Sequence, residues 1–149
     1  MGCSRILVPV DGSDTSFAAV QQAIELALAC EAEMKFLYVV NLEDSLLTPP
    51  VIGKAEAETS VLEDVIDKGR RILDEVLDTV PDAVKAKGHC VSGNPETVIL
   101  REASAGNYDL IVMGSRGLGA IRSVLMGSVS SYVLNNAKCS VMLVKADKK

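Results

Sequence analysis

The residues best suited to chemistry form a glycine-rich segment in the second half of the chain. Gly114-Ser115-Arg116-Gly117 is followed, after nine residues, by Gly127-Ser128. The apolar run at 110–113 predicts a buried strand before this segment, and residues 129–136 predict a short helix after it. Glycine lets a ligand approach the backbone closely, and a helix N-terminus offers N–H donors and partial positive charge. The segment therefore predicts a phosphate-binding site, and a nucleotide is the simplest ligand for it.

The segment differs from two well-known phosphate-binding motifs. Gly114 and Gly119 have the outer spacing of a Walker A loop, but Ala120 stands where that loop needs lysine, and the pattern Gly-x-Gly-x-x-Gly is absent. The site would then depend on backbone N–H groups together with hydroxyl and guanidinium groups. The candidates for these side chains are Ser115, Ser128, Arg116 and Arg122.

Strands and helices that alternate along the chain must position this segment. Apolar runs predict strands at 5–10, 34–40, 84–91, 109–113 and 140–144. Helical spacing and capping residues predict helices after Ser13 or Asp14, at 55–80, at 95–105 after the N-cap Asn94, and at 129–136, with a loop at 42–54. This alternation predicts an α/β fold, an open five-stranded parallel sheet with helices on both faces. The length favours one domain, residues 1–149.

Composition excludes several classes of function. The net charge is −5 and no dense basic patch is present, which argues against nucleic acid as a partner. Neither a signal peptide nor a membrane-spanning segment is found, so we expect a cytoplasmic protein without membrane contact. Four dispersed cysteines and one histidine do not form a zinc-binding pattern. We expect Cys30 and Cys139 to be small core residues in a reduced compartment.

A second polar turn, Pro9-Val10-Asp11-Gly12, follows the first predicted strand. Ligands of open parallel sheets bind at the carboxyl ends of strands, where the strand order reverses. This turn and the glycine-rich segment line one crevice if the first and fourth strands are neighbours, which spacing alone does not decide. Asp11 would then contact the ligand or, alternatively, only bond its own backbone.

Five motifs in order resemble the universal stress protein family, in its ATP-binding branch, over nearly the whole chain. They are Ile6-Leu7-Val8-Pro9-Val10-Asp11-Gly12-Ser13, Leu37-Tyr38-Val39-Val40, Gly93-Asn94-Pro95, the glycine-rich segment with the strand before it, and Val141-Met142-Leu143-Val144. The resemblance implies a Rossmann-like fold of the adenine nucleotide alpha hydrolase type with strand order 3-2-1-4-5. That order would place the first and fourth strands side by side.

The resemblance also implies an ATP site and a dimer. The residues implied to wrap the phosphates are Gly114, Ser115, Arg116, Gly117, Leu118, Gly119 and Ala120, closed over by Gly127, Ser128, Val129 and Ser130 at the helix start. Asp11 would accept hydrogen bonds from the ribose, while Pro9, Val39 and Met126 would border the adenine. Mg²⁺ or Mn²⁺ would be held through the phosphates. Members usually form homodimers, often by pairing their last strands, here Ser140, Val141, Met142, Leu143 and Val144.

Three functions are consistent with these residues. The first is an ATP-binding protein with a regulatory or stress-response role and little or no hydrolysis, because the segment lacks the Walker lysine and a nucleophile paired with a base. The second is a slow ATP-hydrolysing switch or an adenylating enzyme of a related α/β fold. The third is a nucleotide-free dimeric interaction module. We expect at most weak ATPase activity and no dedicated catalytic residue.

Overall fold

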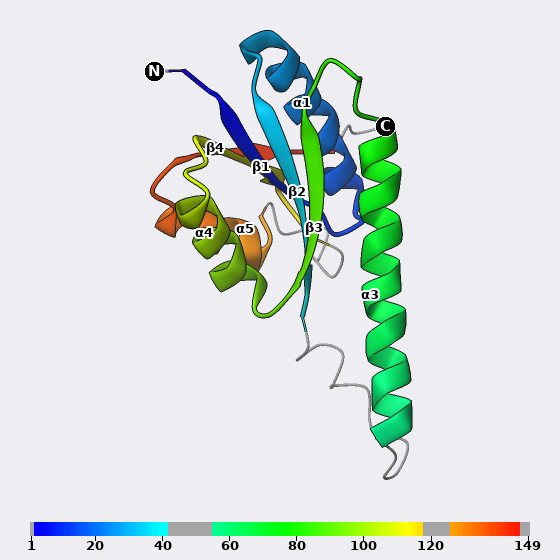
Figure 1. The fold of residues 1–149 in the computed structure, drawn as a ribbon. Helices are drawn as coiled ribbons and strands as arrows, with labels where there is room; N and C mark the ends of the chain where they lie inside the picture. The colour runs from blue at the N-terminus through cyan, green and yellow to red at the C-terminus, as the bar shows by residue number, and fades with distance from the viewer. Residues whose placement is uncertain (1, 42–54, 118–125, 147–149) are drawn as a thin grey trace.

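The structure is a computed structural model and describes residues 2–41, 55–117 and 126–146. Within these residues strands and helices alternate (Figure 1). The elements are β1 (Arg5–Pro9), α1 (Asp14–Cys30), β2 (Glu33–Val40), α3 (Ala55–Asp78), β3 (Ala86–Ser92), α4 (Pro95–Ala105), β4 (Leu110–Gly114), α5 (Ser128–Asn136) and β5 (Ser140–Val144). The predicted loop at 42–54 lies outside the described residues.

All the strand pairs are parallel, and the sheet order is β3-β2-β1-β4-β5, which confirms the predicted fold class and strand order. In the centre, Leu7 of β1 pairs with Lys35 of β2 on one side and with Ile111 of β4 on the other. The connection through α1 leads from β1 to β2, which pairs with one side of β1. The later strand β4 pairs with the other side of β1. The strand order therefore reverses between β1 and β4, where ligands of such sheets bind.

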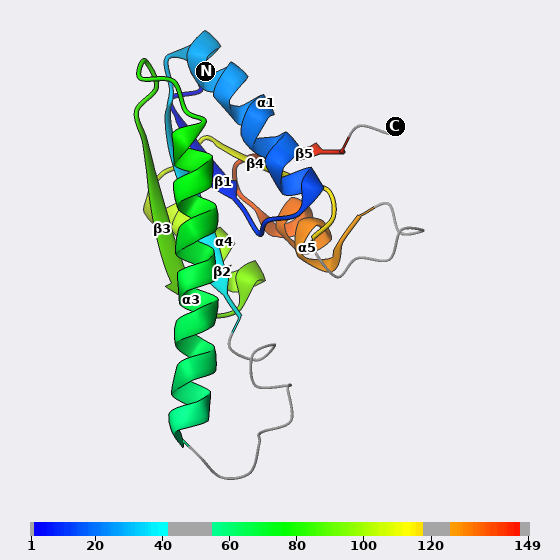
Figure 2. The same cartoon turned by 90° about the vertical axis from the view of Figure 1, so that its right-hand side faces the viewer.

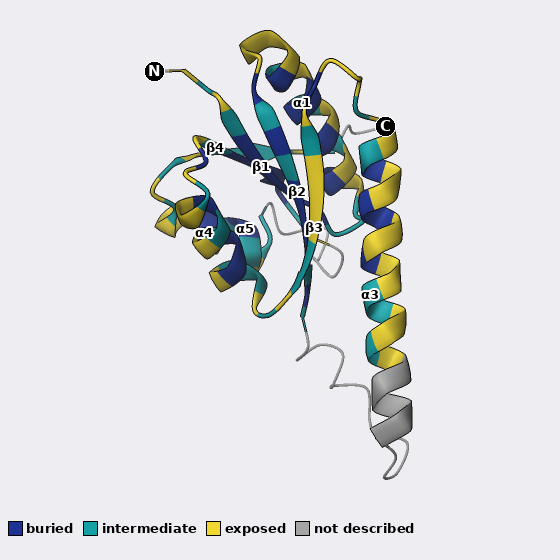
Figure 3. Cartoon of the chain, viewed as in Figure 1, coloured by how far each residue is buried: buried dark blue, intermediate teal, exposed yellow. Residues whose placement is uncertain are grey.

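Two helical layers cover the sheet (Figure 2). Alternate residues of β1 face opposite sides: Ile6 and Val8 pack into the core beneath α1 and α3, and Leu7 packs into the core beneath α4 and α5. All three are fully buried. Parallel strands covered on both faces need such continuous apolar runs, because neither face meets water. Figure 3 shows the resulting contrast between buried central strands and the exposed outer side of α3.

Local signals determine where the helices begin. Ser13 is the N-cap of α1, and its Oγ accepts a hydrogen bond from the Ser16 N–H at 3.2 Å. Asn94 caps α4 by accepting from the Thr97 N–H at 3.3 Å, with Pro95 at the first helical position. The predicted start of α4 is confirmed, and the structure chooses Ser13 over Asp14 as the cap of α1. Each cap supplies an acceptor for an N–H group that has no partner within the helix.

The prediction that Cys30 is a core residue is wrong. Cys30 ends α1 on the exposed side of the helix, whereas Cys139 is half-buried and packs against the core beneath α4 and α5. The sequence around Cys30 is apolar, but Cys30 itself lies off the buried stripe of α1. Apolar periodicity does not locate the buried face reliably at the last turn of a helix. Among the described helices none is both long and apolar enough to cross a membrane.

Candidate functional site

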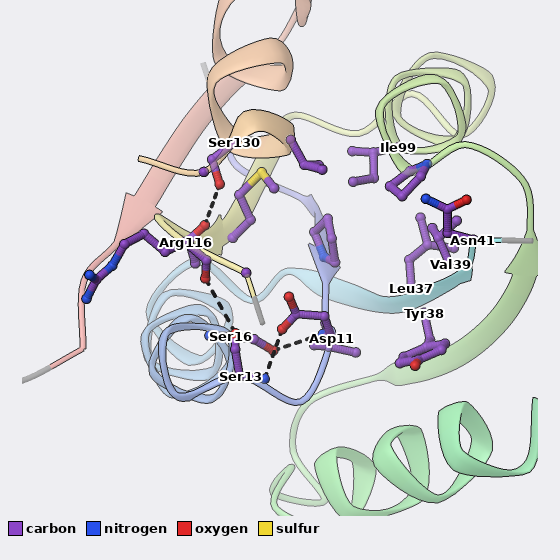
Figure 4. Close-up of a pocket in the computed structure, with 18 of the residues that line it drawn as sticks. Asp11, Ser13, Ser16, Leu37, Tyr38, Val39, Asn41, Ile99, Arg116 and Ser130 are labelled. Carbon is purple, nitrogen blue, oxygen red and sulfur yellow. Dashed lines mark hydrogen bonds between the residues drawn. The ribbon is translucent and has the colours of Figure 1, made fainter. Parts of the chain in front are cut away.

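A cavity of about 470 Å³ opens at the carboxyl ends of β1, β2 and β4 (Figure 4). The turn after β1, the first turn of α4 and the start of α5 complete its walls. This volume is within the range of small-molecule sites. The position is the one at which the strand order reverses, so topology and cavity indicate the same place.

The turn after β1 places the Asp11 carboxylate at the wall of this cavity. Gly12 has φ +86°, which lets the chain turn sharply into α1. Asp11 Oδ1 accepts a hydrogen bond from the Ser13 N–H at 2.9 Å, and the Asp11 N–H donates to Ser16 Oγ at 3.2 Å. One carboxylate oxygen thus bonds the local backbone, as one of the two interpretations of Asp11 expected, while Oδ2 lies toward Gly117.

Gly117 brings the turn after β4 against Asp11. A Cβ atom at Gly117 would lie 2.8 Å from Asp11 Oδ2, closer than a side chain tolerates. At Gly114, a Cβ atom would collide with Thr15 and lie 2.8 Å from the backbone nitrogen of Ser16. The two glycines therefore permit a close approach of this turn to the start of α1.

Hydroxyl groups of α1 hold the same turn in place. Thr15, which is buried, donates from Oγ1 to the carbonyl oxygen of Arg116. Ser13 Oγ lies 3.5 Å from the same oxygen. The Arg116 side chain extends away from the centre of the cavity in Figure 4. The backbone of Arg116 thus shapes the cavity wall while its guanidinium group points elsewhere.

The start of α5 forms the opposite wall. Its N-cap is Gly127, which makes no side-chain cap hydrogen bond and whose N–H donates to the Ser115 carbonyl at 2.8 Å. Ser130 is buried and donates from Oγ to the Gly114 carbonyl at 2.8 Å. The first turn of α5 therefore lies against the end of β4. Helix N-termini of this kind attract anions through their N–H groups and the helix dipole.

Most of the residues predicted for the site line the cavity. They are Pro9, Asp11, Val39, Gly114, Arg116, Gly117, Gly127, Ser128, Val129 and Ser130. Leu118, Gly119 and Ala120 lie outside the described residues, as does Arg122. Ser115 and Met126 do not line the cavity. Ser115 is buried, and its N–H donates to the Val144 carbonyl of β5 at 2.9 Å.

The cavity is also lined by residues that were not predicted from the sequence as site residues. They are Val10, Ser13, Ser16, Leu37, Tyr38, Asn41, Pro95, Ile99 and Met113. Tyr38 is buried; desolvation and, to a lesser degree, the Asp11 carboxylate raise the pKa of its phenol. The end of β2 could have indicated Leu37, Tyr38 and Asn41 as site residues. Because β2 pairs with β1 in parallel, its carboxyl end lies at the same edge of the sheet as the turn at Asp11. Among the described residues no group of three or more His, Cys, Asp and Glu side chains could hold a metal ion.

Proteins of known sequence share this chain's pattern almost from end to end. The model of the universal stress protein family matches residues 3–145. The chain is 33% identical to universal stress protein MJ0531 of Methanocaldococcus jannaschii over 97% of this chain and 84% of that protein. It is 31% identical to universal stress protein YxiE of Bacillus subtilis over 95% of this chain and 99% of that protein.

Solved structures show the same fold. Hypothetical protein MJ0577 superposes with a TM-score of 0.86 at 23% identity, with both chains covered completely. Universal stress protein UspA of Lactobacillus plantarum has a TM-score of 0.75 at 31% identity, covering 97% of this chain and 99% of that one.

Two more distant structures hold nucleotides. A universal stress protein in complex with cAMP has a TM-score of 0.66 at 22% identity and covers 99% of this chain and 100% of that one. A universal stress protein family protein of Arabidopsis thaliana with AMP bound has a TM-score of 0.59 at 19% identity. The match covers 97% of this chain and 92% of that one. The family model and the relatives span nearly the whole sequence, and this chain belongs to the universal stress protein family.

Proposed function

We propose that this chain binds ATP in the cavity at the carboxyl ends of β1 and β4 and has a regulatory or stress-response role. The observation that carries this proposal is the approach of Gly117 to Asp11 across the cavity wall. It places a carboxylate, which accepts hydrogen bonds from hydroxyl groups, beside a glycine-bearing backbone turn that suits phosphates. A nucleotide is a ligand that presents both groups at once.

The phosphates would lie against the turn after β4, with residues 118–120 as further predicted contacts, and against the first turn of α5. Ser128 and Val129 line the cavity there, behind an N-cap residue that has no side chain of its own to accept from the helix N–H groups. Backbone donors would supply most of the hydrogen bonds, since the hydroxyl of Ser130 already donates to the Gly114 carbonyl. Mg²⁺ or Mn²⁺ would be held through the phosphates and would offset their charge.

The base would lie toward the end of β2. Pro9, Val39, Leu37 and Ile99 provide apolar surface on this side of the cavity. The two family structures that hold AMP and cAMP support an adenine nucleotide as the ligand. Asp11 would accept hydrogen bonds from the ribose, between the base and the phosphates.

We propose little or no hydrolysis. Catalysis of phosphoryl transfer requires a group that positions the attacking water and cations that stabilise the transition state. The described cavity wall contains one carboxylate, Asp11, and this group already accepts from the Ser13 N–H. We therefore expect bound nucleotide to be retained and not turned over.

The ligand carried by freshly purified protein tests this function. We expect mass spectrometry of the released ligand to find ATP, and titration calorimetry to give tighter binding of ATP than of AMP or cAMP. Recovery of AMP or cAMP alone would contradict the choice of ATP. The absence of any thermal shift with ATP and Mg²⁺ would favour a nucleotide-free interaction module, and rapid release of ADP or pyrophosphate would favour an enzyme.

We also propose a homodimer formed through β5. This strand is an edge of the sheet, and its residues Val141 to Val144 are half-exposed. Edge strands present unpaired N–H and C=O groups that a second strand can satisfy. Pairing of two such edges would join two sheets into one.

A further inference from the structure

Thr15 of α1 holds one peptide group of the turn after β4 in a fixed direction. Thr15 is buried, with 5% of its surface exposed, and does not line the cavity itself. Its Oγ1 donates a hydrogen bond to the carbonyl oxygen of Arg116. The longer contact of Ser13 Oγ with the same oxygen, at 3.5 Å, comes from the same side (Figure 4). The Arg116 carbonyl is therefore directed toward the start of α1.

This hydrogen bond also determines where the Gly117 N–H points. The peptide group between Arg116 and Gly117 is trans and planar, so its carbonyl and its N–H lie on opposite sides. Because the carbonyl is held against α1, the N–H is directed away from α1. The start of α5 lies beside it, since a Cβ atom added to Gly127 would be 3.4 Å from the Gly117 nitrogen.

Two neighbouring N–H groups at the same place are already used within the protein. The Ser115 N–H donates to the Val144 carbonyl at 2.9 Å, and the Gly127 N–H donates to the Ser115 carbonyl at 2.8 Å. Gly117, in contrast, lines the cavity. Its N–H is thus a backbone donor that the Thr15 hydroxyl aims at the ligand side of the turn.

We propose that Thr15 is a positioning residue that sets the affinity of the cavity for the phosphates of its nucleotide. This role rests on the proposed binding of ATP in the cavity. Thr15 acts through the backbone, because its hydroxyl keeps the Gly117 N–H turned toward the space in which the phosphates would lie. A carbonyl that accepts a hydrogen bond also polarises its peptide group, which makes the N–H of that group a stronger donor.

The role of Thr15 concerns the phosphates and not the nucleoside. Pro9 and Val39, which provide apolar surface for the base, belong to the central strands β1 and β2. The Asp11 carboxylate is oriented by the Ser13 N–H at 2.9 Å. These groups keep their places without the Thr15 hydroxyl. Its loss should therefore weaken the binding of ATP and leave the binding of adenosine unchanged.

Titration calorimetry of the full chain with ATP and Mg²⁺, and separately with adenosine, tests this role. Thr15→Val keeps the shape of the side chain and removes the hydroxyl. We expect it to weaken ATP binding about tenfold and to change adenosine binding by less than about twofold. Thr15→Ser restores the hydroxyl and should bind ATP as the native chain does. Thr79→Val is the matched control, because the Thr79 hydroxyl donates to the Val76 carbonyl at the end of α3.

An amide NMR spectrum gives a second readout that needs no variant. Addition of ATP to the native chain should move the Gly117 amide proton downfield, because a phosphate oxygen is a strong acceptor, whereas adenosine should not move it. Where Thr15→Val does not fold, Thr15→Ala removes the same hydroxyl without adding bulk and gives the same comparison.

Three results would overturn the role of Thr15 while ATP binding stands. They are an unchanged ratio of ATP to adenosine affinity in a folded variant without the hydroxyl, an equal loss for both ligands, and a Gly117 amide that ATP does not shift. A native chain that does not bind ATP would refute the proposed function itself, and the role of Thr15 with it.

Discussion

A Cβ atom added to Gly117 would lie 2.8 Å from Asp11 Oδ2, so one missing side chain determines how closely two turns meet. The carboxylate is oriented from the other side by the Ser13 N–H at 2.9 Å. Any residue larger than glycine must displace Asp11 or the turn that bears Gly117. The shape of the proposed nucleotide site therefore depends on this position.

Gly117→Val is expected to weaken ATP binding by at least about tenfold, because valine must displace either Asp11 or the turn that bears residue 117. Titration calorimetry with ATP and Mg²⁺ measures the effect. Gly2→Val is the matched control, since Gly2 is exposed and a Cβ atom there would have no heavy atom within 4 Å. Unchanged affinity of a folded Gly117→Val protein would refute the proposed site.

Asp109 connects the start of β1 to the start of β4. Its Oδ2 accepts hydrogen bonds from the Ser4 N–H, the Ser4 hydroxyl and the Arg5 N–H, each at 2.9 Å. The hydrogen bonds from Ser4, followed by the one from the Arg5 N–H, lower the pKa of Asp109. The folded state therefore favours the charged carboxylate more than the unfolded chain does.

Asp109→Asn is expected to lower the melting temperature at neutral pH and to have a smaller effect in acid. The stability that the lowered pKa contributes is present above the unfolded pKa of about 3.9 and is lost as the pH falls through the folded pKa. Thermal melts at neutral pH and near pH 3 measure this difference. Asp82→Asn, at an exposed turn, serves as control; an equal loss for Asp109→Asn at both pH values would contradict the argument.

At the scale of the elements, α3 packs against the cavity through a glycine. Gly69 is buried in the middle of α3, and a Cβ atom there would lie 2.5 Å from the ring carbon Cδ1 of Tyr38. Tyr38 in turn lines the cavity. A glycine in a helix costs about 1 kcal/mol relative to alanine, and here it lets the tyrosine ring lie against the helix backbone.

Gly69→Ala should destabilise the protein by about 1 kcal/mol although alanine is the better helix former, because overpacking of about 1–3 kcal/mol exceeds the gain in propensity. Urea denaturation measures this change. In a Tyr38→Leu background, where the ring is absent, the same substitution should be neutral or stabilising. A destabilisation of equal size in both backgrounds would show that the ring is not the cause.

At the scale of the whole molecule, β5 is a free edge in the described part of the chain. The Val144 carbonyl accepts from the Ser115 N–H, so the backbone polar groups of Val144 face β4. Because these groups alternate along a strand, those of Val141 and Leu143 point to the open edge. A second copy of the chain would find its hydrogen-bond partners there.

Val141→Pro is expected to convert the proposed dimer to a monomer, since proline removes an N–H group that points to the open edge and leaves the pairing of β4 with β5 in place. Size-exclusion chromatography with light scattering measures the mass. Val141→Ala keeps the N–H and should remain dimeric. A monomeric native protein, or a dimeric proline variant, would contradict pairing through β5.

The sequence by itself was enough to predict the alternating elements, because apolar periodicity and caps such as Asn94 act within a few residues, although the choice between Ser13 and Asp14 was left to the structure. The glycine-rich segment and the turn at Asp11 could be predicted for the same reason, since both are short and follow a strand. The strand order came from the resemblance, as spacing along the chain cannot say which parallel strands are neighbours.

Only the tertiary structure decided which side chains meet. It buried Ser115 next to β5, left Cys30 exposed, and brought Tyr38 to the cavity against Gly69. These outcomes depend on contacts between residues far apart in sequence. Periodicity shows which face of an element is apolar, but the packing of whole layers determines what that face touches.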